Sequence, residues 1–174
     1  FMVIRLSDGS VKTIDFREKA PELSHRDMFL DDNGNVIPGK SRYTSWAAGV
    51  PGTVYGLGYA HKKYGILPWD VLIYPSIKLA KFGFALDYPN VFLLNSDRYK
   101  KLLSNDKVSK KIFIKDDNYK IGDLFIQKDL SNTLERIAKY GYKEFYEGLT
   151  ADYLISSMHR TGGLITKKDL KSYQ

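Results

Sequence analysis

The chain has 174 residues, a formal net charge of +7 and no cysteine, and hydrophobic residues make up 43% of it. This length and apolar content predict one globular domain with a buried core and exclude an intrinsically disordered chain. The lack of cysteine excludes a disulfide scaffold, a cysteine zinc site and a thiol nucleophile, and no apolar run is long enough to predict a transmembrane helix.

The N-terminal residues predict a β-hairpin. In residues 2–6, Met, Ile and Leu alternate with Val and Arg, which is the spacing of a strand. Residues 7–10 contain the turn dipeptide Asp-Gly, and residues 11–16 form a second strand candidate. Because no charged leader precedes the first strand, we expect the chain to begin inside a structured region, as a fragment or as one piece of a processed precursor.

Helical spacing of apolar residues starts at Pro51. It predicts a first helix that ends at Gly65 and a second from Pro68 to Gly83, which Pro75 is expected to kink or break. The residues expected to be buried in the second helix are Val71, Leu72, Ile77 and Leu79.

The next segments alternate between helical and extended patterns. Residues 88–103 are expected to form one helix, and residues 111–115 and 119–127 are expected to be extended or looped. Residues 129–140 are expected to form a clear helix, and Asp129 is its predicted N-cap.

Local pairs and stop signals complete the prediction of the C-terminal third. Glu135 and Lys139 have the spacing of a favourable ion pair within a helix, and Gly141 is expected to end that helix. Thr150 is expected to cap a later helix that ends at Gly162.

Two short motifs complete the helical pattern. A helical turn is expected at residues 142–146, and residues 166–169 resemble a capping box with Asp in place of Glu. Together the elements predict an α+β chain that is mainly helical, carries one N-terminal hairpin and forms one partial domain over residues 1–174.

Much of the positive charge lies between Arg98 and Lys128. Aspartates interrupt this stretch, and no zinc finger, RNP signature or GXXG loop accompanies it. We therefore expect a solvated lysine-rich face and no nucleic-acid partner, with a polyanion-binding patch as the weaker alternative.

No metal or cofactor site is predicted. Asp31, Asn33 and Asn35 start like a calcium loop, but Val36 and Arg42 stand where such a loop needs Gly and Glu, so we expect a turn. The histidines are far apart and match no metal-binding spacing: His25, His61 and His159.

A glycine series surrounds the start of the first predicted helix. Gly49, Gly52, Gly56 and Gly58 match neither common phosphate-binding pattern, so we expect a helix entry that needs close backbone approach. An anion bound at Gly52-Thr53 is the weaker alternative.

Arg17 follows the second predicted strand. A planar guanidinium at a strand end can bind a carboxylate through two hydrogen bonds. Residue chemistry alone favours the simpler interpretation, in which this arginine is exposed or pairs with Asp15 or Glu18.

Three ordered stretches resemble the γ-glutamyltranspeptidase family. They are an Asp-Phe-Arg-Glu segment with its flanks in residues 1–31, a Gly-Val-Pro-Gly-Thr segment with its continuation in 48–80, and the Phe-Tyr-Glu-Gly and Gly-Gly-Leu-Ile-Thr segments in 145–170. Their order and approximate spacing match the family over nearly the whole chain.

The resemblance implies a larger enzyme. Members are N-terminal nucleophile hydrolases with an αββα sandwich, whose precursor cuts itself into a large and a small subunit. The N-terminal threonine of the small subunit takes the γ-glutamyl group from glutathione or a related amide, forms an acyl-enzyme and passes the group to water, amino acids or peptides. No metal or organic cofactor is needed.

This chain would be the middle-to-late part of the large subunit, and its partner would be the small subunit of the same precursor. The catalytic threonine would lie outside it, so the piece alone is expected to be inactive. No catalytic role is assigned to its own candidates, which are Thr150, Thr161 and Thr166.

The resemblance also changes the interpretation of Arg17. This residue matches the family arginine that binds the α-carboxylate of the γ-glutamyl substrate, which would orient the γ-carbonyl for attack. The Gly-Val-Pro-Gly-Thr segment is expected to be scaffold, and the setting is expected to be periplasmic or secreted.

Two alternatives stay open. One is a cephalosporin-acylase-like amidohydrolase on the same scaffold. The other is a non-catalytic basic helical module that binds a polyanion or a partner chain.

Overall fold

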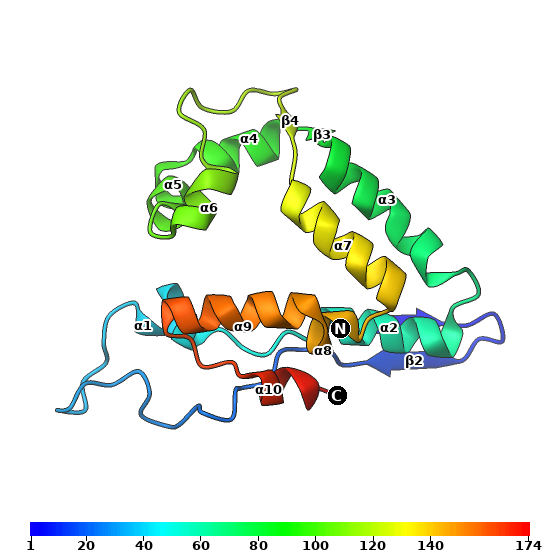
Figure 1. The fold of residues 1–174 in the computed structure, drawn as a ribbon, viewed down its shortest axis with the longest axis horizontal. Coiled ribbons are helices and arrows are strands. Elements are labelled where there is room, and N and C mark those ends of the chain that lie inside the picture. The colour runs from blue at the N-terminus through cyan, green and yellow to red at the C-terminus, as the bar shows by residue number, and fades with distance from the viewer. The chain divides into compact units, whose positions relative to one another are not determined.

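The computed structural model describes residues 1–174 and forms two compact units. The first unit comprises residues 1–72 and 136–174, and the second comprises residues 73–135. Figure 1 shows the fold and labels most of its helices and strands. The single partial domain expected over 1–174 stays a prediction.

The first unit combines a hairpin with helices. Its elements are β1 (Met2–Arg5), β2 (Val11–Ile14), α1 (Lys40–Tyr43), the 3-10 turn η1 (Ser45–Ala47), α2 (Thr53–Tyr64), α8 (Glu144–Glu147), α9 (Leu149–Thr161) and α10 (Lys167–Lys171). Those of the second unit are β3 (Phe84–Ala85), α4 (Tyr88–Asn95), α5 (Asp97–Leu103), α6 (Lys107–Phe113) and β4 (Leu124–Phe125). Two helices continue from one unit into the other: α3 (Trp69–Phe82) and α7 (Lys128–Tyr140).

The predicted N-terminal hairpin is confirmed. Strands β1 and β2 pair antiparallel, with Met2 opposite Ile14. In the turn the Asp8 carboxylate accepts the Ser10 N–H at 2.8 Å, and Gly9 has a φ of 84°. A left-handed residue at this position is what a glycine supplies without steric cost.

Helices α2 and α3 confirm the two predicted central helices. The expected break at Pro75 is absent, because α3 continues from Trp69 to Phe82 across the proline. Pro75 removes one donor from the helix. Hydrogen bonds from Leu72 to Pro68 and from Gly83 to Leu79 continue the helical pattern on both sides.

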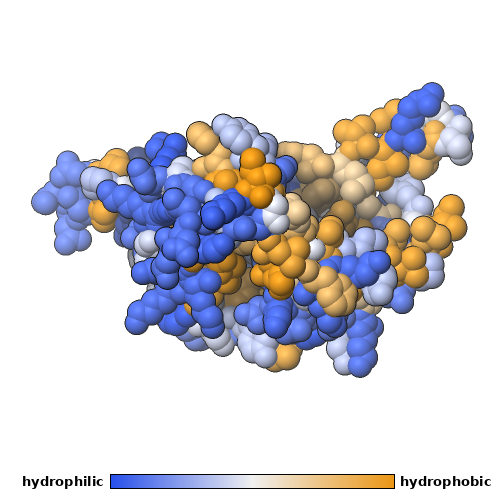
Figure 2. All heavy atoms as spheres, turned by 90° about the horizontal axis from the view of Figure 1, so that it is seen from above, coloured by the Kyte–Doolittle hydropathy of each residue, from blue (hydrophilic) through white to orange (hydrophobic).

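The expected burial of α3 is only partly correct. Ile77 is buried, and Ala80, three residues later on the same face, is buried with it. Val71, Leu72 and Leu79 are exposed. Leu72 and Leu79 are seven residues apart and share another face of the helix. Apolar side chains also reach the surface among hydrophilic ones in Figure 2.

The second unit differs from the prediction in two places. The single helix expected over 88–103 is divided at Ser96, which adopts extended backbone and caps α5 by accepting the Tyr99 N–H. Residues 111–113, expected to be extended or looped, are instead the last turn of α6, whose start is capped by Asp106 accepting the Ser109 N–H at 2.7 Å.

The predicted helix over 129–140 is confirmed as α7, with corrections to its details. It begins at Lys128, so Asp129 lies inside its first turn and is not the N-cap. Glu135 pairs at 2.9 Å with Lys81 instead of Lys139. Gly141 ends the helix with a φ of 82°, as predicted.

The C-terminal helices follow their predicted stop and capping-box signals but not the predicted cap of α9. Helix α9 begins at Leu149 after Gly148, so Thr150 is a buried first-turn residue and not the cap. Gly162 ends α9 with a φ of 68°. The predicted capping box of α10 is present, since Thr166 and Asp169 satisfy each other's backbone N–H groups.

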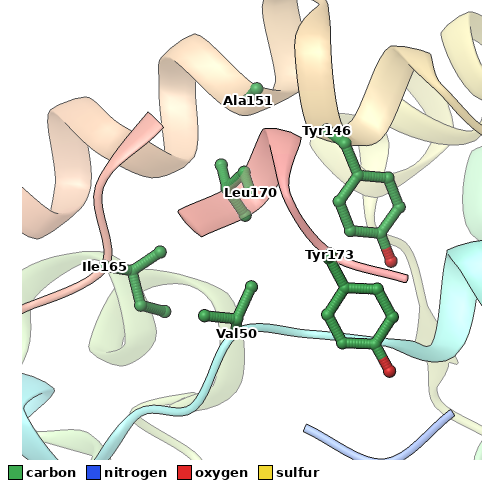
Figure 3. Packing of buried hydrophobic residues seen from close by; sticks show 6 residues of the cluster. All are labelled: Val50, Tyr146, Ala151, Ile165, Leu170 and Tyr173. Carbon is green, nitrogen blue, oxygen red and sulfur yellow. The ribbon is translucent and has the colours of Figure 1, made fainter. Parts of the chain in front are cut away.

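The core of the first unit lies among α8, α9, α10 and the segment before α2. Figure 3 shows its buried residues, which are Val50, Tyr146, Ala151, Ile165, Leu170 and Tyr173. This core connects the C-terminal helices to the residues that precede α2, and it positions the site described below.

Candidate functional site

Arg17 lies at a surface hollow of about 490 Å³. Two segments form the hollow: the residues that follow β2 and the residues at the start of α2. Its lining residues are Phe1, Phe16, Arg17, Glu18, Pro51, Gly52 and Thr53. The Gly-Val-Pro-Gly-Thr segment, expected to be scaffold, therefore also contributes to the wall of the hollow.

The Arg17 guanidinium is largely exposed. Its Nε donates to Glu18 Oε1 at 3.2 Å, and 67% of the Arg17 side chain is accessible. The Glu18 backbone N–H and the Arg17 side chain together lower the pKa of Glu18. An ion pair exposed to water is weak, so the carboxylate of a ligand can replace Glu18 at little cost.

The main chain of Arg17 is fixed on both sides. Its amide N–H donates to Asp15 Oδ1 at 2.9 Å, and its carbonyl oxygen accepts a 2.6 Å hydrogen bond from the Tyr173 hydroxyl. Two residues on, Lys19 and Val50 exchange backbone hydrogen bonds of 3.2 and 2.7 Å. A charged side chain thus extends from a backbone that is held in place.

The glycine series confirms the predicted close approach of backbones. A Cβ atom on Gly52 would overlap the Tyr173 hydroxyl and the Phe16 carbonyl oxygen, and one on Gly56 would overlap the Phe16 ring. A Cβ atom on Gly49 would lie 2.7 Å from Glu18 Cγ. The missing side chains let the Arg17 segment pack directly on the start of α2.

Tyrosines that the sequence analysis did not single out support both segments. The Tyr146 hydroxyl donates to the Pro51 carbonyl oxygen at 2.8 Å and accepts the Tyr55 N–H at 3.0 Å. Burial raises the pKa of Tyr146 to about 12, although the Tyr55 N–H opposes the shift. The rings of Tyr146 and Tyr173 stack with centroids 5.8 Å apart.

A compositional signal for these tyrosines was present in the sequence. The chain contains 13 tyrosines, and a buried tyrosine needs a hydrogen-bond partner for its hydroxyl. Composition does not identify the partner, because the acceptors here are main-chain carbonyl groups far away in the sequence.

The other candidate residues do not form a second site. The structure contains no group of three or more His, Cys, Asp or Glu residues that could hold a metal ion. Asp31 forms the predicted turn, because its carboxylate accepts the N–H groups of Asn33 and Asn35, and these bonds lower its pKa. His61 contacts the Leu67 carbonyl oxygen at 2.8 Å.

The three threonines without an assigned role are all engaged in structural contacts. Thr150 accepts hydrogen bonds from Arg136, and Thr166 caps α10. The Thr161 hydroxyl accepts from Ser45 and donates to a carbonyl oxygen of its own helix. Each of the three hydroxyl groups therefore has a structural role.

The lysine-rich stretch lies in the second unit, where Lys100 and Lys115 have local partners. Lys100 contacts Asn118, and Lys115 pairs with Asp123 at 2.8 Å.

No helix in the structure combines the length and apolar character that are needed to cross a membrane.

Comparisons with known proteins find relatives that match the chain over its full length. A protein-family model described as gamma-glutamyltranspeptidase matches residues 1–174. The glutathione hydrolase proenzyme of Escherichia coli (strain K12) is 42% identical over 176 residues, covering 100% of this chain and 30% of that protein. The chain therefore spans less than a third of this curated relative.

Solved structures agree with the sequence comparison. The Helicobacter pylori γ-glutamyltranspeptidase is 43% identical with a TM-score of 0.94, covering 99% of this chain and 50% of that one. A cephalosporin acylase from Bacillus halodurans is 21% identical with a TM-score of 0.80, covering 97% of this chain and 32% of that one, which shows a shared fold alone. The predicted α+β class is confirmed, and this chain belongs to the γ-glutamyltranspeptidase family.

Proposed function

We propose that this chain is part of an enzyme that transfers the γ-glutamyl group of glutathione or related amides to water, amino acids or peptides. The transfer proceeds through an acyl-enzyme on a threonine outside these residues. The family match over residues 1–174 and the 42% identity to a glutathione hydrolase proenzyme support this proposal.

The same proposal covers the architecture of the whole protein. The chain is the middle-to-late part of a large subunit within an αββα sandwich, and its partner is the small subunit of the same precursor. The word proenzyme in the names of the Escherichia coli and Bacillus subtilis relatives supports a processed precursor. The periplasmic or secreted setting stays a prediction.

Arg17 binds the α-carboxylate of the γ-glutamyl donor. One observation carries this assignment: an exposed guanidinium extends from a fixed backbone at the edge of a hollow of about 490 Å³. An arginine keeps its charge at every physiological pH and can donate two parallel hydrogen bonds to a carboxylate. Holding that carboxylate fixes the far end of the donor and so orients its γ-carbonyl toward the nucleophile.

Substitution of Arg17 in the intact enzyme tests the assignment. Arg17→Ala should raise KM for a γ-glutamyl donor by about 10- to 150-fold, the equivalent of a charged hydrogen bond of roughly 1.5–3 kcal/mol, with kcat largely kept. Arg17→Lys keeps the charge but loses the two-pronged geometry, so it should fall between wild type and Arg17→Ala.

A matched control and a modified donor sharpen the test. Arg26 is almost fully exposed, lies outside the hollow and pairs loosely with Asp27 at 3.8 Å, so Arg26→Ala should leave KM unchanged. A donor with an amide in place of the α-carboxylate should bind poorly to wild type and lose nothing more in Arg17→Ala. An unchanged KM in Arg17→Ala with the ordinary donor would refute the assignment.

A further inference from the structure

The Tyr173 hydroxyl and the Arg17 carbonyl group join the two ends of the chain. The 2.6 Å hydrogen bond between them spans 156 positions in the sequence. Tyr173 is only 6% exposed, and its burial, followed by the nearby charges of Asp15 and Glu18, raises the pKa of its phenol. The hydroxyl therefore keeps its proton at neutral pH and acts as a donor.

Tyr173 is itself held rigidly. Its ring stacks on Tyr146 and meets the Tyr55 ring edge-on, with centroids 5.6 Å apart in the second contact. It follows α10, whose Leu170 is completely buried in the core of the first unit, as Figure 3 shows. Because packing already fixes the Tyr173 hydroxyl, its hydrogen bond can hold the Arg17 carbonyl oxygen in one place with little loss of entropy.

A second contact ties the same part of the chain to the Arg17 segment. The Asp169 carboxylate, which caps α10, also accepts the Glu22 N–H at 2.8 Å. The segment that carries Arg17 is thus attached at Glu22 to Asp169 of α10, and at the Arg17 carbonyl group to Tyr173, which follows α10. Of these two hydrogen bonds, only the one from Tyr173 acts on Arg17, the residue that lines the hollow.

The hydroxyl also lies against the second segment that lines the hollow, at the start of α2. Gly52 lines this hollow, and its Cα faces the Tyr173 hydroxyl so closely that a Cβ atom would overlap it. One phenol oxygen therefore touches both segments that form the hollow. Its removal would loosen the Arg17 backbone while leaving the guanidinium and the hollow in the protein.

We propose that Tyr173 is a positioning residue for the γ-glutamyl donor: its hydroxyl holds the Arg17 carbonyl group and thereby places the guanidinium to receive the donor carboxylate. This inference rests on the function proposed above for Arg17. Tyr173 touches neither the reacting carbonyl nor the donor carboxylate, and it acts through Arg17 alone. Its loss should therefore weaken donor binding and leave the chemical step nearly unchanged.

Kinetics of Tyr173→Phe and Arg17→Ala, alone and combined, test the inference in the intact enzyme. Tyr173→Phe keeps the ring and removes only the hydroxyl. It should raise donor KM by about 3- to 10-fold, as expected for one neutral hydrogen bond, with kcat within about twofold of wild type. In the Arg17→Ala background, the same change should alter KM by less than about twofold, because the residue through which it acts is gone.

The outcomes separate this inference from the proposed function. If Arg17→Ala raises KM and Tyr173→Phe does not, the positioning role is refuted while the proposed function stands. If Arg17→Ala leaves KM unchanged, the proposed function itself fails. If Tyr173→Phe raises KM equally in both backgrounds, the hydroxyl acts by a route other than Arg17, and the inference is also refuted.

A control and a second variant guard against a purely structural effect. Ser45→Ala removes another hydroxyl that makes a tertiary hydrogen bond, to Thr161 at 2.7 Å, away from the residues of the hollow, and it should not change KM. If Tyr173→Phe does not yield folded protein, 3,5-difluorotyrosine at position 173 replaces it. Fluorination lowers the phenol pKa, so KM for the γ-glutamyl donor should rise once the fluorinated phenol loses its proton. Profiles identical to wild type over the pH range in which the absorbance of the fluorinated phenol shows it to titrate would refute the inference.

Discussion

Gly52 lies so close to Tyr173 that a Cβ atom on the glycine would overlap both the phenol oxygen and the Phe16 carbonyl oxygen. Its φ of −108° is one that any residue adopts. The need for glycine at this position therefore comes from contact between segments far apart in the sequence and not from the local backbone.

Gly52→Ala should destabilise the protein by about 3 kcal/mol, since neither the packed Tyr173 ring nor the Phe16 backbone can move away cheaply. Urea denaturation of the intact protein measures the loss. Gly34→Ala is the matched control, because Gly34 has a φ of 81° with open space around it and should cost only about 1 kcal/mol for its left-handed backbone. Equal losses in the two variants would contradict the contact argument.

Tyr146 should make stability depend on alkaline pH. Its pKa is raised from 10.0 to about 12, so the folded state holds the proton more tightly than the unfolded state. The resulting stabilisation is complete below pH 10 and is lost as the pH rises toward 12. Two pKa units correspond to about 3 kcal/mol.

Unfolding free energies at several pH values above 9 measure this effect. Wild type should lose stability more steeply with pH than Tyr146→Phe, which lacks the titrating group but retains the other tyrosines. Parallel curves for the two proteins would show that Tyr146 titrates normally in the folded state.

The buried ion pair between Arg136 and Glu144 should matter more than an exposed pair. Arg136 Nε lies 3.3 Å from Glu144 Oε1, and the Glu144 side chain is 4% exposed. The same oxygen also accepts the Thr150 N–H at 3.0 Å. Glu144→Ala should cost about 3–5 kcal/mol, because it leaves a partly buried charge without this carboxylate.

Glu135→Ala is the control for that prediction. Glu135 is 42% exposed and pairs with Lys81 at 2.9 Å, so its loss should cost about 0–1 kcal/mol. Glu144→Gln should retain more stability than Glu144→Ala. Only Oε1 of Glu144 accepts hydrogen bonds, while Oε2 has no partner, so the amide oxygen of glutamine can take the place of Oε1. Denaturant midpoints that rank these variants differently would contradict the role of burial.

The lysine-rich face should be dispensable for catalysis. Replacing Lys100, Lys101, Lys110 and Lys111 with glutamine should leave kcat and KM within about twofold of wild type, because none of these lysines lines the hollow at Arg17 and charges in contact with water are screened by salt. Steady-state kinetics of the intact enzyme check this expectation. A collapse of activity would show that this face participates in the reaction or in assembly.

Predictions from the sequence were correct where the signal and the structure it specifies lie within a few residues. The turn at Gly9, the helix stops at Gly141 and Gly162 and the capping box of Thr166 with Asp169 are all local. Each depends on one backbone conformation or one short hydrogen bond, which the residue type itself favours.

The errors occur where a distant residue or a neighbouring cap changes the outcome. Glu135 forms its ion pair with Lys81, which is 54 positions away, instead of with Lys139 in its own helix. Thr150 is a buried acceptor for Arg136 and not a cap. The apolar spacing of α3 predicted burial of Leu79, but periodicity does not say which apolar face another element covers.

The amino-acid sequence by itself determined the hairpin, most helices and the resemblance to the family, because these depend on residue types and their spacing along the chain. Only the tertiary structure decided that Tyr173 holds the Arg17 carbonyl group and that Gly52 must lack a side chain. Both contacts form between segments that meet only when the chain folds, and no local preference of either segment encodes where the other will lie.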